Sequence, residues 1–302
     1  MSTIDVVAAS RWFGNVVAVN DVTMSIGPGV TGLLGPNGAG KSTLIALMAG
    51  FLSPSSGTVT IDGQRAWHNE SIYRQIGLVP EHEGMYDVVT GWDLVRANAL
   101  LHKLKDPDAA TRRAIGTVEM APAQDRSIST YSKGMKQRIK MATALVHDPA
   151  VLLLDEPFNG MDPRQRIQLM DLLHRLGETG RTVLFSSHIL EEVEQIAGSI
   201  QVMVAGRHAA SGDFRQIRRL MTERPHEYTI SSSDDRALAA AIIADGSASG
   251  VELGDTLLVR AGDYARFTRT LAPLAQRAGV RLYAVSPADE SLESVFAYLV
   301  AR

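Results

Sequence analysis

The stretch Val30-Thr-Gly-Leu-Leu-Gly-Pro-Asn-Gly-Ala-Gly-Lys-Ser-Thr-Leu-Ile-Ala-Leu-Met48 decides the fold of this chain. Its apolar start predicts a β-strand over residues 30–34, and residues 43–48 have the composition of a helix start. The glycine-bracketed segment between them, residues 35–42, therefore has the setting that a phosphate-binding loop requires. A glycine-rich turn that ends in Lys-Ser by chance is the alternative, but the full spacing favours a site for a nucleoside triphosphate.

The residue types of this loop suit the binding of phosphate. Its glycines let the backbone turn sharply and approach an anion with consecutive N–H groups and the positive end of the following helix. Lys41 supplies a charge to the β- and γ-phosphates, and the Ser42 hydroxyl is a ligand for Mg²⁺. The residues expected to contact the nucleotide here are Gly35, Pro36, Asn37, Gly38, Ala39, Gly40, Lys41, Ser42 and Thr43.

The composition is that of an ordinary globular chain of 302 residues, 45% of them hydrophobic, and such a chain is long enough for two domains. With 30 basic and 33 acidic residues the formal charge is −3, which offers no general attraction to nucleic acid or to an anionic bilayer. There are no cysteines, so disulfides and thiolate metal sites are excluded. We recognise no secretion signal and no membrane span, and expect the chain to be soluble by itself.

Strand and helix patterns alternate along most of the chain, which predicts an α/β fold with a mostly parallel sheet flanked by helices. Helical periodicity over residues 88–147 indicates an inserted helical subdomain. We expect the first domain to cover residues 1–222 and a linker to follow at residues 222–226. Residues 226–302 are predicted to form a strand, a helix, two strands, a helix, a strand and a final helix. This order suggests a small C-terminal α+β domain of the ferredoxin-like kind.

Two carboxylates and a histidine follow predicted strands further along the chain. Asp155 and Glu156 end a buried-type strand, where Asp155 would hold Mg²⁺ and Glu156 would polarise the attacking water. His188 follows another strand end and is placed to reach a γ-phosphate. Alone, the acidic pair is equally well explained as a turn or cap, and a lone histidine is more often structural. The pairing with the phosphate-binding loop favours the catalytic interpretation of the two carboxylates.

A third segment, Thr130-Tyr-Ser-Lys-Gly-Met-Lys-Gln-Arg138, has the features of a helix start. Ser132 is the predicted N-cap, Gly134 permits a close backbone approach, and Lys133 and Lys136 lie nearby. In isolation, a capped and solvated helix start is the better explanation of this segment.

Together these segments resemble the nucleotide-binding subunits of ABC transporters. Residues 35–43, 131–138, 152–157 and 159–162, followed by His188, occur in the order and spacing of that family. The resemblance is to ATPase subunits of ABC-2 type exporters in particular, whose signature often reads Tyr-Ser-Lys-Gly-Met. A weaker match, Ser291-Leu-Glu-Ser-Val-Phe296, is similar to the end of their accessory domain. The resemblance implies a P-loop ATPase cassette that hydrolyses ATP with Mg²⁺.

The resemblance also implies contacts between subunits and with adenine. Phe13 would stack on the adenine ring, but the neighbouring Trp12 is also aromatic, and simple packing explains either ring. Ser132, Lys133 and Gly134 would act in trans, by closing over ATP held by a second subunit. A head-to-tail dimer with two ATP molecules at its interface is therefore implied, and a homodimer is expected.

Four further positions are interpreted through the same resemblance. Asp162 would communicate between the two sites, although it also suffices as an ordinary N-cap, and His188 would sense the γ-phosphate. Glu81 stands where the family normally has Gln; a carboxylate can still ligate Mg²⁺ but cannot donate a hydrogen bond as an amide does. Phe158 replaces the small polar residue that usually follows Glu-Pro, and the sequence gives no functional reason for it.

A family member without a membrane span needs a membrane partner. We expect an integral membrane permease, with this chain cytoplasmic and peripheral at the inner face of the membrane. Docking is expected near the Glu81 loop, although packing inside the subdomain explains any one of its apolar residues equally well. The apolar cluster at this place consists of Met85, Tyr86, Val88, Val89 and Trp92.

A soluble ABC ATPase that acts on nucleic acid or ribosomes is the main alternative. The near-neutral charge, the single cassette and the ordinary length of the insertion favour transport, with no nucleic-acid partner. A metabolic P-loop kinase is a third possibility, but it would leave residues 131–138 unexplained.

Overall fold

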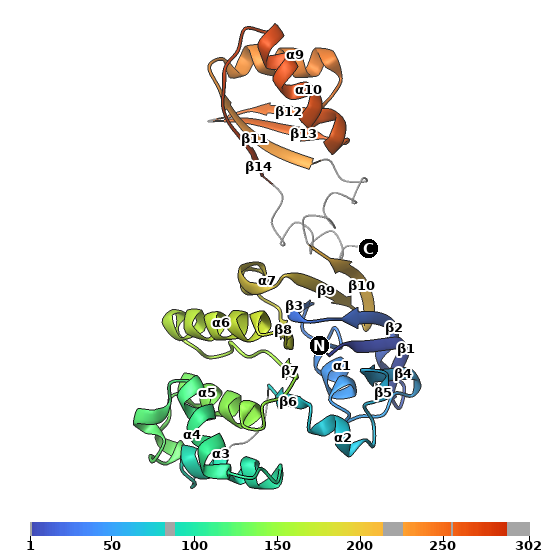
Figure 1. Ribbon diagram of the computed structural model, residues 1–302. Helices are drawn as coiled ribbons and strands as arrows, with labels where there is room; N and C mark the ends of the chain where they lie inside the picture. The colour runs from blue at the N-terminus through green and yellow to red at the C-terminus, as the bar shows by residue number, and fades with distance from the viewer. Residues whose placement is uncertain (1, 82–87, 214–225, 255, 289–302) are drawn as a thin grey trace. The chain divides into compact units, whose positions relative to one another are not determined.

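Figure 1 shows a computed structural model of the chain, which describes residues 2–81, 88–213, 226–254 and 256–288. The chain divides into two compact units, Met1–Gly212 and Asp213–Arg302, and the domain bounds 1–222 and 226–302 stay a prediction. The expectations for Met85, Tyr86, the linker up to residue 225 and the helix from Ser291 lie outside the described residues. Among the described helices none is long and apolar enough to cross a membrane.

A six-stranded sheet forms the centre of the first unit, with β3 between β9 and β8. All neighbours are parallel except β9 and β10, which confirms the predicted mostly parallel sheet. Every residue of β7 and β8 is buried, as in parallel sheets that are covered on both faces. In sheet order the strands are β10 (Arg207–Gly212), β9 (Ser199–Val204), β3 (Gly29–Leu34), β8 (Thr182–Ser187), β7 (Val151–Leu154) and β6 (Ile76–Val79).

A separate antiparallel sheet packs beside α1 (Lys41–Met48), and its inner face shares one apolar core with that helix and with β3. Leu33, Leu44 and Ile61 are fully buried in this core. Burial of each such side chain contributes roughly 1.5–3 kcal/mol, so the core fixes the ends of β3 and α1 on either side of the loop. The strands of this sheet are β2 (Val16–Ile26), β1 (Ile4–Phe13), β4 (Ser56–Ile61) and β5 (Gln64–Arg65).

Three helices form the predicted helical insertion between β6 and β7, and in Figure 1 they gather away from the antiparallel sheet. They are α3 (Gly91–Leu101), α4 (Pro107–Thr117) and α5 (Lys133–Leu145). Each begins at a side chain that accepts a backbone N–H, since Thr90, Asp106 and Ser132 are the N-caps. The short α2 (Glu70–Tyr73) precedes β6.

Two further helices pack on the central sheet. The first, α6 (Pro163–Glu178), starts with Asp162 as N-cap and a proline at its first turn, as the sequence predicts. The second, α7 (Leu190–Ile196), packs closely on β3 at Gly32. A Cβ at Gly32 would come within 2.5 Å of Val193 Cγ1, so only glycine permits this approach.

The second unit has its own sheet and its own core. Its strands pair antiparallel throughout in the order β12-β13-β11-β14, which interleaves two βαβ halves as in ferredoxin-like folds. Phe267 is fully buried at the centre of an apolar cluster. The elements along the chain are β11 (His226–Ser232), α9 (Asp235–Asp245), β12 (Gly250–Leu253), β13 (Leu257–Ala261), α10 (Tyr264–Arg277) and β14 (Leu282–Pro287).

Candidate functional site

The glycine-rich loop joins the end of β3 to the start of α1. Gly40 caps α1 with a φ of 97° and has no side chain to occupy the first amides of the helix. A Cβ at Gly40 would lie 2.3 Å from the carbonyl oxygen of Ala18, and one at Gly35 would lie 2.4 Å from that of Met203. The loop is therefore held against two neighbouring backbones, and its amides and the positive helix end are left to bind an anion.

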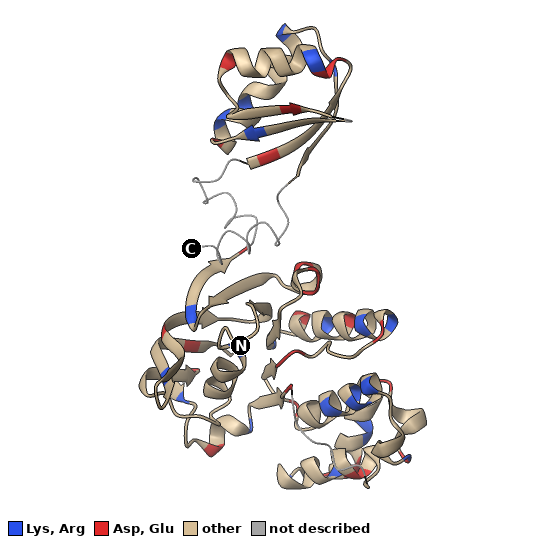
Figure 2. Ribbon diagram, turned by 180° about the vertical axis from the view of Figure 1, so that it is seen from behind, with Lys and Arg blue, Asp and Glu red and all other residues tan. Residues whose placement is uncertain are grey.

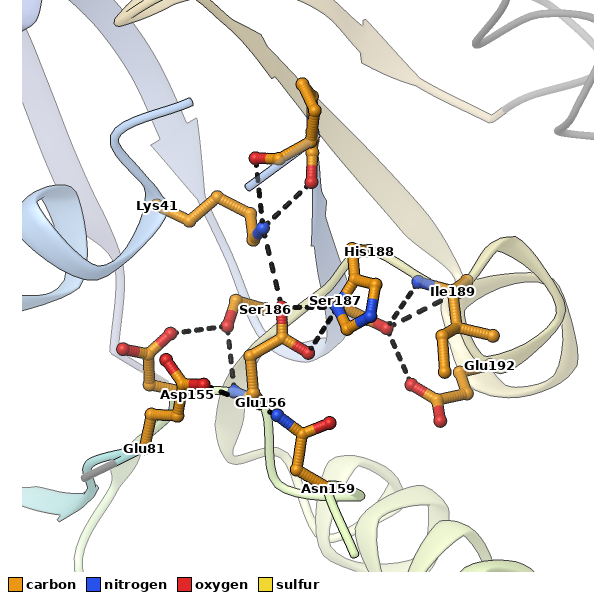
Figure 3. Close-up of polar contacts among 12 residues, drawn as sticks. Lys41, Glu81, Asp155, Glu156, Asn159, Ser186, Ser187, His188, Ile189 and Glu192 are labelled. Atoms are coloured by element: carbon orange, nitrogen blue, oxygen red, sulfur yellow. Dashed lines mark hydrogen bonds and ion pairs between the residues drawn. The ribbon is translucent and has the colours of Figure 1, made fainter. Parts of the chain in front are cut away.

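Lys41 lies across this loop and is almost fully buried. Its Nζ donates a hydrogen bond to the carbonyl oxygen of Gly35 at 2.8 Å and forms an ion pair with Glu156 Oε1 at 3.4 Å (Figure 3). The lysine and the carboxylate are 6% and 7% exposed, so each depends on the other for compensation of its charge. This contact brings the loop and the end of β7 into one site.

The two predicted carboxylates follow the last residue of β7, and Ser186 on β8 holds both. Ser186 Oγ donates to Asp155 Oδ1 at 2.6 Å and accepts the backbone N–H of Glu156 at 2.9 Å. Sequence reasoning did not single out Ser186. The contact follows from the register of β7 and β8. Leu154 pairs with Phe185, so the next residues along the chain, Asp155 and Ser186, also come close together.

Glu156 has a left-handed backbone with a φ of 48°, which is uncommon for a residue other than glycine. Such strain gathers at functional sites.

Phe158, which departs from the family pattern, has a structural reason. Its side chain is 2% exposed and packs edge-on against Phe185 with ring centroids 5.6 Å apart. Phe158 therefore fills the core behind the two carboxylates and takes no part in the polar contacts of Figure 3.

His188 lies just past β8 and contacts Glu156. Its Nδ1 is 3.0 Å from both Glu156 Oε1 and Glu156 Oε2, and its side chain is 39% exposed. A proton on Nδ1 would be shared with the carboxylate, which leaves Nε2 as the second functional atom of the ring. The structure thus joins His188, Glu156 and Lys41 in one series of contacts.

Glu81 reaches the same region from the end of β6. Asn159 Nδ2 donates to Glu81 Oε1 at 3.4 Å, and Lys140 Nζ donates to the Glu81 carbonyl oxygen at 3.4 Å. The sequence did not predict the contact between Asn159 and Glu81, although Asn159 lies in the motif at residues 159–162. Asp162 accepts the backbone N–H of Gln165 at 2.9 Å and acts as the expected N-cap.

A cleft of about 420 Å³ opens over the loop. Val16 and Val17 line one side of it and are 64% and 49% exposed, so they present apolar surface that the sequence reading missed. Phe13 pairs with Val16 across the hairpin and carries the Arg11 guanidinium 4.7 Å from its ring centroid, while Trp12 pairs with Val17. Adenine stacking by Phe13 or by Trp12 stays a prediction. The remaining lining residues are Ala18, Asn37, Gly38, Ala39, Gly40, Lys41, Ser42, Thr43, Glu81 and Glu156.

The start of α5 does not contribute to this cleft, whose lining residues all belong to the described part of the chain. Ser132 and Lys133 are exposed, and Ser132 Oγ accepts the backbone N–H of Met135 at 3.2 Å. Gly134 is buried under the side chain of Gln165, close enough that a Cβ would clash with it. The predicted group Ser132, Lys133 and Gly134 therefore does not line the cleft of its own chain.

The oxygen donors near the loop suit Mg²⁺. Ser42 and Glu81 line the cleft, and Asp155 is buried behind Glu156 with Oδ1 fixed by Ser186. Mg²⁺ usually takes one or two protein oxygens and completes its shell with phosphate and water, so no dedicated protein cage is required. Within the described ranges no group of three or more His, Asp or Glu side chains forms such a cage.

Comparison with known proteins identifies the same segments. A family model described as ABC transporter matches residues 19–159, which include the loop and both carboxylates. The bacitracin transport ATP-binding protein BcrA of Enterococcus faecalis is 30% identical over 300 residues, covering 96% of this chain and 94% of BcrA. The linearmycin resistance ATP-binding protein LnrL of Bacillus subtilis is 30% identical, covering 96% of each chain. A solved ATP-binding subunit of an ABC transporter superimposes with a TM-score of 0.65 at 29% identity, over 72% of this chain and 92% of the other.

Proposed function

Because this chain belongs to the ABC transporter family of ATP-binding proteins, we propose that it is the ATP-hydrolysing subunit of a membrane exporter and drives a separate transmembrane subunit. The observation that carries the proposal is the meeting of three side chains at the loop. Glu156 lies 3.4 Å from Lys41 Nζ and 3.0 Å from His188 Nδ1. Similarity to BcrA and LnrL over nearly their whole lengths supports transport as the use of the hydrolysis.

The site residues divide the hydrolysis of ATP between them. The loop amides and Lys41 hold the β- and γ-phosphates. Glu156 accepts a proton from the water whose oxygen attacks the γ-phosphorus, while the bond from phosphorus to the bridging oxygen of ADP breaks. His188 fixes the carboxylate through Nδ1, and its Nε2 is available to the γ-phosphate. When bound, Mg²⁺ would be held by Ser42, Asp155 and Glu81 and would offset the charge of the phosphates.

Lys41 links substrate binding to the activity of this base. In the structure its ammonium divides its contacts between the carbonyl oxygen of Gly35 and the carboxylate of Glu156. A triphosphate on the loop competes for the same ammonium, because it carries more negative charge than one carboxylate. We therefore expect ATP to draw Lys41 from Glu156, so that the base is free to take up water only when substrate is present.

A second copy of the chain would complete the site. At the start of α5, Ser132 and Lys133 are exposed. The helix carries four basic residues and no acidic residue along its length, and Lys and Arg follow it in Figure 2. A helix start with basic residues attracts phosphate. Because Ser132 lies outside the cleft of its own chain, we propose that it closes over ATP on another copy in a head-to-tail homodimer.

An integral membrane permease is the second proposed partner, which would place this chain at the inner face of the membrane. A groove of about 490 Å³ lies between the central sheet and the helical insertion, lined among others by Tyr73 and Leu78 on one side and Leu94 on the other. Phe51 at its edge is 61% exposed, and Val88 of the predicted docking cluster is 91% exposed. Such apolar surface beside the site suits a short cytoplasmic segment of the permease.

Substitution of Glu156 tests the proposed function. The Glu156→Gln variant keeps the shape of the side chain but removes the base, so we expect hydrolysis to fall by about 100-fold or more while ATP binding persists. Glu194→Gln, which removes an exposed acid on α7, serves as the matched control and should hydrolyse ATP at the wild-type rate. Wild-type hydrolysis by Glu156→Gln would overturn the assignment. Stimulation of hydrolysis by RNA, and not by a co-purified polytopic membrane protein, would overturn the role in transport.

A further inference from the structure

Glu192 is a buried acid on α7 that the hydrolysis mechanism does not use. It is 3% exposed, and its two carboxylate oxygens contact different elements. Oε2 accepts a hydrogen bond from Ser187 Oγ at 2.6 Å, and Oε1 lies 3.3 Å from Arg166 Nη1. A carboxylate taken out of water needs such partners, and burial raises the pKa of Glu192 whereas Ser187 and Arg166 oppose the rise.

Through Ser187, the carboxylate fixes the turn that carries His188. Ser187 Oγ donates to Glu192 and also accepts the backbone N–H of Ile189 at 2.9 Å, so the residues before and after His188 share one hydroxyl (Figure 3). The imidazole between them places Nδ1 at 3.0 Å from the Glu156 carboxylate. A displaced Ser187 would therefore change the direction of His188.

Through Arg166, the same carboxylate is tied to the start of α6. Arg166 lies in the first turns of that helix, and its backbone N–H donates to the carbonyl oxygen of Asp162 at 2.9 Å. Within the described part of the chain, Arg166 Nε and Glu192 Oε1 are buried without a hydrogen bond. The ion pair thus has spare donors and acceptors, and a small shift of α6 can tighten or loosen it.

We propose that Glu192 and Arg166 are positioning residues that couple the Asp162 end of α6 to the orientation of His188 against Glu156. The inference rests on the proposed function, in which a second copy closes over the site, and on the predicted role of Asp162 in communication between the two sites. Displacement of the start of α6 moves Arg166, the carboxylate of Glu192 follows, and the hydroxyl of Ser187 resets His188. The coupling would let closure of the dimer change the orientation of His188 and, through it, the contacts of the catalytic base Glu156.

The Glu192→Gln variant tests this inference in the full-length chain, with Glu194→Gln on the exposed face of the same helix as matched control. A misdirected His188 should lower kcat by about 10-fold or more and leave the KM for ATP unchanged, because the phosphate-binding loop is untouched. Ser187→Ala, which keeps every charge, should lower kcat in the same way. In a double-mutant cycle Arg166→Gln should add little to Glu192→Gln, because both variants break one linkage.

A readout independent of ATP hydrolysis separates this inference from the proposed function. In histidine-labelled protein, the His188 imidazole resonance, assigned with His188→Gln, should shift in Glu192→Gln and Ser187→Ala and stay in place in Glu194→Gln. An unchanged resonance together with unchanged kcat would overturn the positioning role, as would a fall in kcat equal to that of the control. If the wild-type chain hydrolyses no ATP, the proposed function fails, and the resonance still tests the contact.

Discussion

Ser186 shows how one hydroxyl organises two catalytic candidates. It donates to the side chain of Asp155 and accepts from the main chain of Glu156, and both of these residues are less than a tenth exposed. Buried polar groups need partners, and no other single side chain in Figure 3 contacts both residues. The position of the proposed metal ligand and the position of the proposed base therefore depend on the same oxygen atom.

Ser186→Ala should raise the concentration of Mg²⁺ that is needed for half-maximal hydrolysis of ATP. Without the hydroxyl, Asp155 loses its orienting donor, and loss of such a contact typically lowers metal affinity by about 10-fold or more. The orphaned N–H of Glu156 should also lower the free energy of unfolding by about 1–3 kcal/mol. Titration of ATP hydrolysis with Mg²⁺ measures the first effect. Ser187→Ala is the contrast, because its hydroxyl contacts Glu192 and not Asp155, and an equal Mg²⁺ midpoint in both variants would contradict the prediction.

At this scale the sequence identifies residue types but not their contacts. Lys41, Glu156 and His188 follow from strand ends and from the spacing of motifs. Their separations of 3.4 Å and 3.0 Å arise from the registers of β3, β8 and β7, which no motif encodes. For the same reason Ser186 was missed, although it lies only two positions before His188.

In the loop between β3 and α1, Gly40 combines a positive φ of 97° with a crowded position, whereas the distant Gly63 has a positive φ and an open position. Gly40→Ala would force a Cβ to 2.3 Å from the carbonyl oxygen of Ala18, in addition to about 1–2 kcal/mol for a left-handed backbone. We expect a loss of ATP binding and a markedly lower unfolding midpoint. Gly63→Ala is the control, since Gly63 has a φ of 75° but nothing within 4 Å of a Cβ. Equal stability of the two variants in thermal unfolding would refute the steric argument.

Two stacked histidines join the ends of α3 and α5. The rings of His102 and His147 are parallel within 6° with centroids 3.7 Å apart, and His147 Nε2 lies 3.0 Å from the carbonyl oxygen of Ile76 on β6. Burial lowers the pKa of His147 to about 4, helped by His102 and opposed by the Ile76 contact and Asp148. Burial and then Arg74 lower the pKa of His102. Lys140 lines the same groove as both rings.

This pair predicts how stability depends on pH. The folded chain holds His147 with a pKa below the ordinary 6.5, so the unfolded chain binds the proton more readily. The contribution of His147 to the free energy of unfolding is therefore fully present above pH 6.5 and is lost as the pH falls toward 4. Allowing for partial exposure, we expect a loss on the order of 2 kcal/mol from His147. Urea unfolding of wild type and His147→Gln at pH 7 and pH 4.5 measures it, and equal losses in the two proteins would contradict the assignment.

Most helices and strands could be predicted from the sequence, and the exceptions share a cause, which is a backbone with positive φ. The sequence Ile76-Gly-Leu-Val79 predicts a short strand, and β6 has these bounds because no charged or polar side chain interrupts the segment. The sequence predicts a first strand over residues 4–8, but β1 runs on to Phe13. The irregularity at Ala8, where φ is 47° and the pairing register shifts, lets the strand continue beyond this residue. The strand β10 was missed because its two-residue turn uses Ala205 and Gly206, both with positive φ, without the usual Asn-Gly signal.

For the whole molecule, each unit can be understood from its own core, whereas the proposed function requires a second copy of the chain to complete the site. The second unit buries Phe267 in a cluster of its own, and the cleft of the first unit is lined by residues between Val16 and Glu156. The start of α5 carries three further predicted nucleotide contacts, Ser132, Lys133 and Gly134, and does not line that cleft. Because motif order is a property of one chain, the sequence shows which residues are needed and not which copy supplies them.

Engineered cysteines decide which copy supplies Ser132, and the chain has no native cysteine to interfere. In a Glu156→Gln background with ATP and Mg²⁺, a chain carrying both Asn37→Cys and Ser132→Cys should form disulfides between copies, because Asn37 lines the cleft of one chain and Ser132 would face it from the other. A dimer band on a non-reducing gel should appear with ATP and fade without it. Neither single substitution should give that band, since each lacks its partner in the facing chain. A disulfide within one chain, or a dimer band from Ser132→Cys alone, would show that the site is not completed head-to-tail by a second copy.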